Sequence, residues 1–224
     1  MARKLHDLAA RVTALVKDKD NYLTSPNDEE AAVTAAAFSL SKWKPLLRVK
    51  EYSGDGSTYN LDAPSFWAPG FSRVIDIRTP WVELSQSPAR PLPESDYLVY
   101  LDTDNVEKIK LLATIPATGE TCRVLYTAPH VIDNTSSTLT SIEDEERVIA
   151  AAAAICLHQM AAIANANANA GFGTDSKDHT TRATQYTALA EFYSKRSGLS
   201  DGLAVSVITL PREDSQGRRW LTHR

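Results

Sequence analysis

The residues in this chain that are best suited to chemistry are its histidines, cysteines and clustered carboxylates. The two cysteines, Cys122 and Cys156, stand alone, and no C-x-x-C pair occurs. None of the five histidines lies four residues from another, as two ligands on one helix face would. We therefore predict no metal site and no cofactor, and the unpaired cysteines favour a reduced, intracellular product.

One acid–histidine pair, Asp178-His179, has the composition of a catalytic dyad. It stands where a helix is predicted to begin, and an acid in that position complements the helix dipole. Neither G-x-x-x-x-G-K-[ST] nor G-x-G-x-x-G occurs to hold phosphates. Because no nucleophile, base and orienting group come together, we expect that the protein is not an enzyme.

The composition is typical of a soluble protein. The chain has 224 residues, of which 43% are hydrophobic and 23% charged, and its formal net charge is −4. This charge argues against a protein that coats nucleic acid. The longest apolar run, residues 148–164, is mostly alanine, so it is predicted to be a buried helix, too short and too weakly hydrophobic to span a bilayer.

The spacing of apolar residues and the turn residues predict which elements position these groups. Helical periodicity predicts four helices, at about 4–18, 26–43, 141–164 and 176–197. An Asn-Ala repeat from Asn165 is expected to fray the third helix. Residues 46–130 hold short runs of β-branched and aromatic residues separated by Gly and Pro, which predict an antiparallel β unit.

The predicted fold is therefore α+β. A four-helix body is interrupted by an antiparallel β sandwich or barrel and followed by an extended C-terminal arm. The expected parts are the first part of the helical body, 1–45, the inserted β domain, 46–130, the second part of the helical body, 131–198, and the docking arm, 199–224.

Four consecutive acids open the third helix: Glu143, Asp144, Glu145 and Glu146. Their simplest role is to complement the helix dipole on a solvated face. The functional alternative is an acidic surface that repels a nucleic acid backbone inside a channel. The alanines at 150–154 allow close helix packing, in a core or at a subunit interface.

The C-terminal arm combines a strand-like segment with a basic, aromatic end. Its apolar residues Val205, Val207, Ile208 and Leu210 can add as a strand to a neighbouring sheet. The residues 217–224 include Trp and Arg, which often anchor interfaces. We predict that the arm docks on a partner; the alternative is a disordered terminus.

An alanine-rich helix followed by a tyrosine-patterned helix is the most recognisable arrangement in the chain. The first contains Glu145-Glu-Arg-Val-Ile-Ala-Ala-Ala-Ala-Ala-Ile-Cys-Leu157, and the second has Tyr186, Ala190 and Tyr193 in a Tyr-x-x-x-Ala-x-x-Tyr pattern. This arrangement resembles the helical pair of head–tail connector (adaptor) proteins of tailed bacteriophages. The resemblance covers about residues 1–44 and 141–198, and the β unit resembles the inserted β domain of larger adaptors.

The resemblance implies an oligomeric ring, commonly of twelve copies, seated between the portal protein and a tail or neck protein. DNA would pass through the lumen without specific binding, and no membrane would be involved. Helix packing would use Ala152, Ile155, Tyr186, Ala190 and Tyr193. Docking into the portal would use Arg218, Arg219, Trp220, Leu221, His223 and Arg224.

The function expected from the sequence is thus a virion structural protein, made in the host cytoplasm and located at the head–tail interface. One alternative is another phage neck or tail component, such as a stopper or a tail terminator. Another is a ligand-binding β module on a helical scaffold. The aromatic residues available to such a module are Tyr59, Phe66, Trp67, Phe71 and Trp81.

Overall fold

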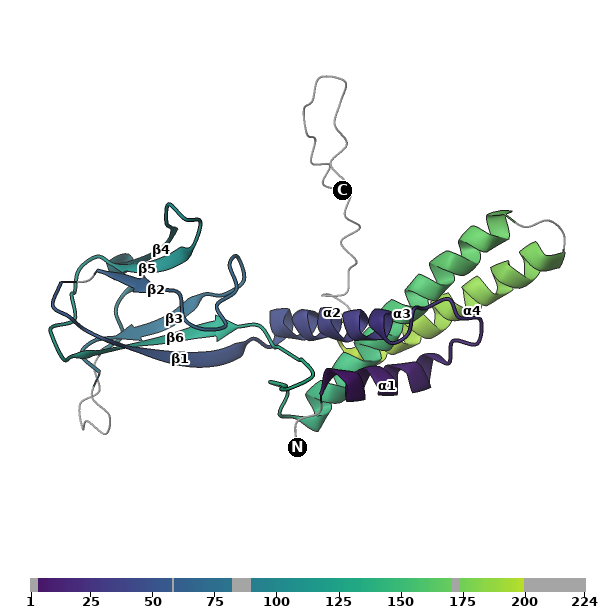
Figure 1. Ribbon diagram of the computed structural model, residues 1–224, viewed down its shortest axis with the longest axis horizontal. Helices are drawn as coiled ribbons and strands as arrows, with labels where there is room; N and C mark the ends of the chain where they lie inside the picture. Colours follow the sequence, from purple (N-terminus) through teal and green to yellow (C-terminus); the bar gives the residue numbers. More distant parts are fainter. Residues whose placement is uncertain (1–3, 58, 82–89, 171–173, 200–224) are drawn as a thin grey trace, which may run out of the picture. The chain divides into compact units, whose positions relative to one another are not determined.

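The computed structural model describes residues 4–57, 59–81, 90–170 and 174–199. Those residues form an α+β fold with four α-helices and two small antiparallel sheets (Figure 1). The chain divides into a helical unit, Met1–Trp43 with Val131–Arg224, and a β unit, Lys44–His130. The β unit begins two residues before the predicted insertion, 46–130, and ends at the same residue.

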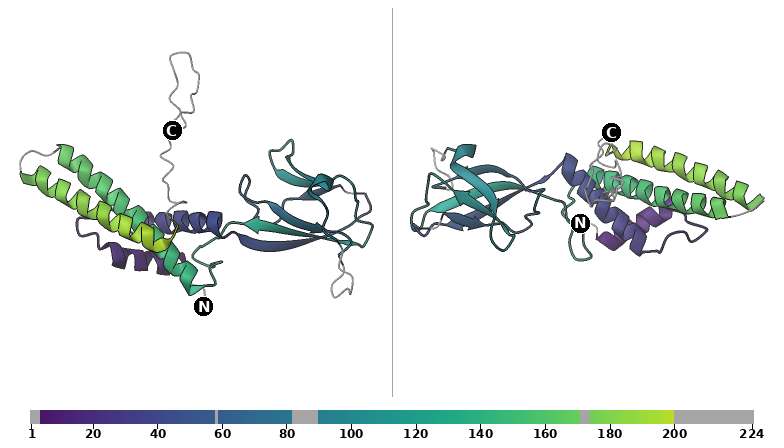
Figure 2. Two further views of the ribbon diagram at one scale, coloured as in Figure 1. Left: turned by 180° about the vertical axis from the view of Figure 1, so that it is seen from behind. Right: turned by 90° about the horizontal axis from the view of Figure 1, so that it is seen from above.

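The helical unit contains α1 (Leu5–Val16), α2 (Asn27–Trp43), α3 (Ile142–Ala170) and α4 (Thr174–Ser197). The helix α3 packs against each of the other three, and α3 and α4 lie side by side along their length (Figures 1 and 2). The prediction that α3 frays at Asn165 is wrong, because the helix continues through the Asn-Ala repeat. Packing against α4 outweighs the low helix propensity of asparagine there.

Local hydrogen bonds set the start of two of these helices. Before α2, the Asp28 carboxylate accepts a bond from the Thr24 N–H at 2.8 Å. At the start of α3, the Ser141 hydroxyl accepts a bond from the Glu143 N–H at 3.2 Å. Each bond satisfies a side chain or backbone group that the helix itself leaves unpaired.

The core of the helical unit is built mainly on α3. Its buried residues include Val148, Ile149, Ala151, Ala152, Ala153, Cys156, Leu157 and Met160. They meet Leu8 and Val12 of α1 and Val33 and Leu40 of α2. Small side chains in the middle of α3 let the neighbouring helices approach it closely, so apolar area is buried on several sides of one helix.

The sequence-based prediction that the apolar run of α3 cannot span a bilayer needs correction. The segment Ile142–Ala168 is long and apolar enough to cross a membrane by length and composition. However, 67% of its most apolar window is buried inside the helical unit. This burial is what the core helix of a folded domain shows.

A polar cluster fastens the α1–α2 loop to α4. The Asp20 carboxylate pairs with Arg182 at 3.0 Å and accepts a hydrogen bond from the Tyr186 hydroxyl at 3.3 Å. The Tyr22 hydroxyl lies 3.4 Å from His179 Nδ1, and its ring meets that of Tyr186 edge to face. These contacts join residues far apart in the sequence.

The β unit contains β1 (Leu46–Ser53), β2 (Asn60–Asp62), β3 (Val74–Arg78), β4 (Tyr97–Leu101), β5 (Glu107–Leu111) and β6 (Thr121–Ala128). One sheet has the order β1-β6-β3, the other the order β2-β5-β4, and all pairs are antiparallel. Both sheets contribute to one core, made of Leu61, Ile77, Ile109, Leu111, Cys122 and Val124. Alternate residues of each strand therefore point into this core, and the others point away from it.

The substitution Ala190→Leu tests the close packing of α4 on α3. Ala190 is fully buried, so the larger side chain should lower the free energy of unfolding by about 1–3 kcal/mol. The matched control is Ala188→Leu at an exposed position of the same helix, which should change it by less than about 0.5 kcal/mol. Urea unfolding followed by far-ultraviolet circular dichroism measures both. Equal midpoints for the two variants would contradict the packing described here.

Candidate functional site

The outer face of the β1-β6-β3 sheet brings together charged and apolar side chains in regular rows. Along β6, Cys122 and Val124 point into the core, so Arg123 and Leu125 project from the other face. The strand register sets Leu125 between Val49 of β1 and Asp76 of β3. The next row sets Arg123 between Glu51 of β1 and Arg78 of β3.

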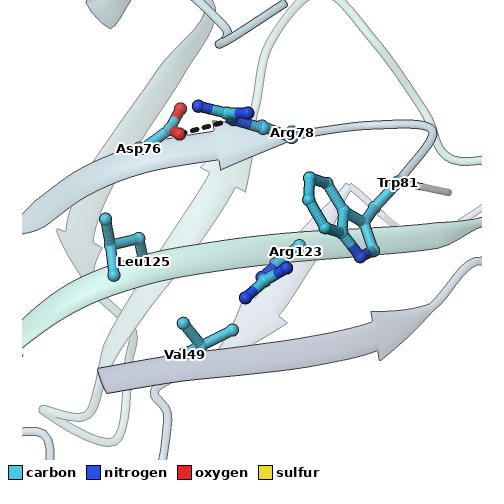
Figure 3. A pocket seen from close by; sticks show the side chains of 6 residues that line it. All are labelled: Val49, Asp76, Arg78, Trp81, Arg123 and Leu125. Carbon is cyan, nitrogen blue, oxygen red and sulfur yellow. Dashed lines mark hydrogen bonds and ion pairs between the residues drawn. The ribbon is translucent and has the colours of Figure 1, made fainter. Parts of the chain in front are cut away.

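A hollow of about 220 Å³ lies on this face. Figure 3 shows the side chains that line it: Val49, Asp76, Arg78, Trp81, Arg123 and Leu125. Val49 and Leu125 form an apolar floor, while the guanidinium groups and the Trp81 indole lie along one side (Figure 3). We call this hollow the sheet-face site.

The sheet-face site contains two arginines and one carboxylate. Arg78 Nε donates to Asp76 Oδ2 at 2.6 Å. The guanidinium of Arg123 lies 4.2 Å from the centre of the Trp81 ring, and that of Arg78 lies 5.9 Å from it. A cation over an indole face is attracted by the ring, which holds Arg123 in place without neutralising its charge.

Two groups in the sheet-face site are left without a charge or hydrogen-bond partner among the described residues. Arg123 forms no ion pair there, although Glu51 is opposite it in register. The second carboxylate oxygen of Asp76, Oδ1, is buried and accepts no hydrogen bond. Among the described residues, the site therefore offers a guanidinium without an ion-pair partner, an aromatic ring and an apolar floor, which together suit the binding of a planar anionic molecule.

Of the aromatic residues considered for a ligand-binding β module, Trp81 lies in the sheet-face site. Trp67 instead packs against the β core and Tyr126, with its indole N–H donating to Glu107. Phe66 lies under the Arg48 guanidinium, 3.9 Å away. The sequence reasoning missed Arg78 and Arg123, although their positions on the polar side of alternating strands are visible in the sequence.

The four acids predicted to form one surface have different surroundings. Asp144 and Glu145 are buried, whereas the side chains of Glu143 and Glu146 are 73% and 43% exposed. Glu143 pairs with Arg147 at 2.7 Å, and Glu146 pairs with Arg11. The expectation of a continuous acidic surface is therefore wrong, because the fold buries two of the acids and pairs the other two with arginines.

The residues expected to pack helices lie in or against the core of the helical unit. Ala152 and Ala190 are fully buried, and Ile155, Tyr186 and Tyr193 pack against them from partly buried positions. They contribute to the fold of one chain. The predicted arm strand, Val205, Val207, Ile208 and Leu210, and the predicted docking residues, Arg218, Arg219, Trp220, Leu221, His223 and Arg224, lie outside the described residues.

The Asp178-His179 pair does not open a helix, because α4 begins earlier, at Thr174. His179 contacts the Tyr22 hydroxyl and so belongs to the cluster that fastens the α1–α2 loop. Among the described residues, no three His, Cys, Asp or Glu side chains gather as metal ligands would.

Comparison with known proteins shows a partial similarity to an enzyme. No family model matches the chain. A thymidylate kinase of Schizosaccharomyces pombe is 30% identical over 94 residues. The aligned part covers 42% of this chain and 43% of the kinase, so the chain spans less than half the length of that relative.

These findings correct two inferences drawn from the sequence. The resemblance to phage head–tail connectors is contradicted, because no family model supports it and the similar protein is a thymidylate kinase. The expectation that the protein is not an enzyme is contradicted too, because that relative is an enzyme. The sequence contains no G-x-x-x-x-G-K-[ST] loop, so a nucleotide phosphate would have to be held here by other groups, such as arginines.

The two cysteines are predicted to be unreactive in the folded protein. Burial raises the pKa of the Cys122 thiol to about 11 and, with the nearby acids Glu29 and Asp28, that of Cys156 to about 12. Because only the thiolate attacks a disulfide reagent, both should react slowly with dithiobis-nitrobenzoate at pH 8 and rapidly after unfolding in urea. The variants Cys122→Ser and Cys156→Ser assign each thiol. A thiol that reacts in the native protein as fast as in urea would contradict its burial.

Proposed function

We propose that the protein is a structural subunit of a phage virion, which forms an oligomeric ring that joins the portal to the tail and lets DNA pass through its lumen. The proposal rests on the surface of the helical unit and on the charge of the chain. The observation that carries it is an exposed apolar patch on the helix α4.

In the α4 patch, Leu189 and Phe192 are 47% and 58% exposed on the side away from the buried Ala190. On α2, Phe38 and Trp43 are 42% and 59% exposed, but they lie on different sides of the helix, and Lys42 and Arg147 lie over their rings. Single exposed apolar residues are ordinary, but large ones that recur on one helix face, as on α4, favour contact with another protein. Contacts of this kind between successive subunits close into a ring when the rotation allows.

The charge of the chain supports passage of DNA without binding. The net charge is −4, and the exposed acids at the start of α3 are paired with arginines. Such a surface has no large excess of positive charge to bind the phosphate backbone of DNA. It also has no dense group of unpaired acids to repel that backbone. In this proposal the C-terminal arm provides the contact with the portal.

The substitution Phe192→Glu tests the ring. Placing a charge in the α4 patch should prevent subunits from associating, so the variant should be monomeric where the wild type forms a closed oligomer. The control is Gln185→Glu, which adds the same charge at an exposed polar position of α4. Size-exclusion chromatography with light scattering measures the mass, and electron microscopy with the portal protein shows whether a ring with a central hole forms.

The outcomes of this experiment separate the two parts of the proposal. A wild-type protein that stays monomeric, alone and with the portal, would overturn it. If the Gln185→Glu variant dissociates as completely as the Phe192→Glu variant, the α4 patch is not the subunit contact. A chain truncated after Gly198 should keep the ring and lose the portal, and undiminished portal binding would overturn the role of the arm.

A second candidate function is the phosphorylation of a nucleotide, which the similarity to a thymidylate kinase favours. In this reaction the bond between the β–γ bridging oxygen and the γ-phosphorus of ATP breaks, and a phosphate oxygen of thymidylate bonds to that phosphorus. The products are ADP and thymidine diphosphate.

Chromatography of a mixture of the full chain, ATP, Mg²⁺ and thymidylate tests this candidate. We expect thymidine diphosphate and ADP to accumulate in equal amounts, in proportion to protein concentration. The control is the same mixture without thymidylate, which reveals contaminating ATP hydrolysis. Absence of thymidine diphosphate after prolonged incubation at high protein concentration would overturn this candidate.

A further inference from the structure

We propose that the sheet-face site of the β unit binds a nucleoside monophosphate, with the phosphate held by Arg123 and Arg78 and the base lying against Trp81 and the apolar floor. The choice of a nucleotide as ligand rests on the second candidate function above. The site itself rests on the geometry of the β1-β6-β3 sheet.

The two arginines of the sheet-face site lie directly opposite each other. Arg78 and Arg123 are direct register partners on neighbouring strands. Like charges in that position repel, and Asp76 pairs with Arg78 alone. One positive charge therefore remains without a counterion among the described residues. A phosphate bound by both guanidinium groups would remove this repulsion, and the fork of donors on each group matches phosphate oxygens.

The shape and lining of the sheet-face site suit a flat base. Its floor is made by Val49 and Leu125, and the Trp81 indole stands at its edge (Figure 3). An aromatic ring and aliphatic side chains bind a flat base through stacking and burial of apolar surface. The hollow has a volume of about 220 Å³, so it takes a single base, while the phosphate would lie outside the apolar floor. The sheet-face site therefore has guanidinium groups for the phosphate and an aromatic and apolar surface for the base.

Isothermal titration calorimetry of the full chain tests the proposal, with thymidine monophosphate, thymidine and inorganic phosphate as separate ligands. Thymidine monophosphate should bind, and each of the other two should bind at least about tenfold more weakly, because each makes only part of the contacts. Equal affinity for phosphate and the nucleotide would overturn the role of the base. No heat with any ligand would overturn the site.

Arg123→Gln is the decisive variant, and Arg73→Gln is its matched control. Arg73 is an exposed arginine of the same unit that does not line the site, so its loss removes the same charge. Arg123→Gln should weaken nucleotide binding by about tenfold or more, whereas Arg73→Gln should leave it unchanged. Equal weakening by both variants would mean bulk attraction of an anion and would overturn the site.

Two further measurements keep the result interpretable. Circular dichroism melting shows whether Arg123→Gln is folded, and Arg123→Lys retains the charge without the fork, so it should bind with intermediate affinity. If the nucleotide binds but no thymidine diphosphate forms, the proposed binding site is supported and the proposed kinase activity is contradicted. Formation of thymidine diphosphate by Arg123→Gln with an unchanged KM would overturn the site and leave the kinase candidate standing.

Discussion

The packing of three helices around α3 is the contact on which the helical unit depends. The small alanine side chains in the middle of α3 let neighbouring helices approach its backbone closely. The helix α4 packs on one side of α3, and α1 and α2 also bury their apolar residues against it. Because neighbouring helices cover so much of α3, a segment apolar enough for a membrane serves here as a core element. The same packing turns Leu189 and Phe192 outward, since Ala190 occupies the inner face of α4.

The β unit is stabilised differently: its two small sheets pack face to face and bury a shared core. Ile77, Cys122 and Val124 fill the space between them, and strand alternation then forces Arg78 and Arg123 onto the opposite face. Opposite charges would be the favourable cross-strand pair at that position, yet two arginines stand there. Trp81 and Asp76 offset part of the repulsion and leave a cationic, partly apolar surface.

The two surfaces favour different kinds of function. The exposed apolar patch on α4 favours association with other subunits, whereas the sheet-face site favours a small anionic ligand. They belong to separate units, so neither excludes the other. The similarity to a thymidylate kinase contradicts the family resemblance inferred from the helices. The alanine and tyrosine pattern of those helices is also what close helix packing requires.

The sequence by itself determined the kinds of elements and their order. The helices α1, α2, α3 and α4 begin within about two residues of their predicted positions, because periodicity and turn residues act over short stretches of chain. Only the tertiary structure decided that Asp144 and Glu145 are buried and that Arg78 faces Arg123. Those facts depend on which strands pair and which helix faces meet, and long-range packing of the whole chain sets both.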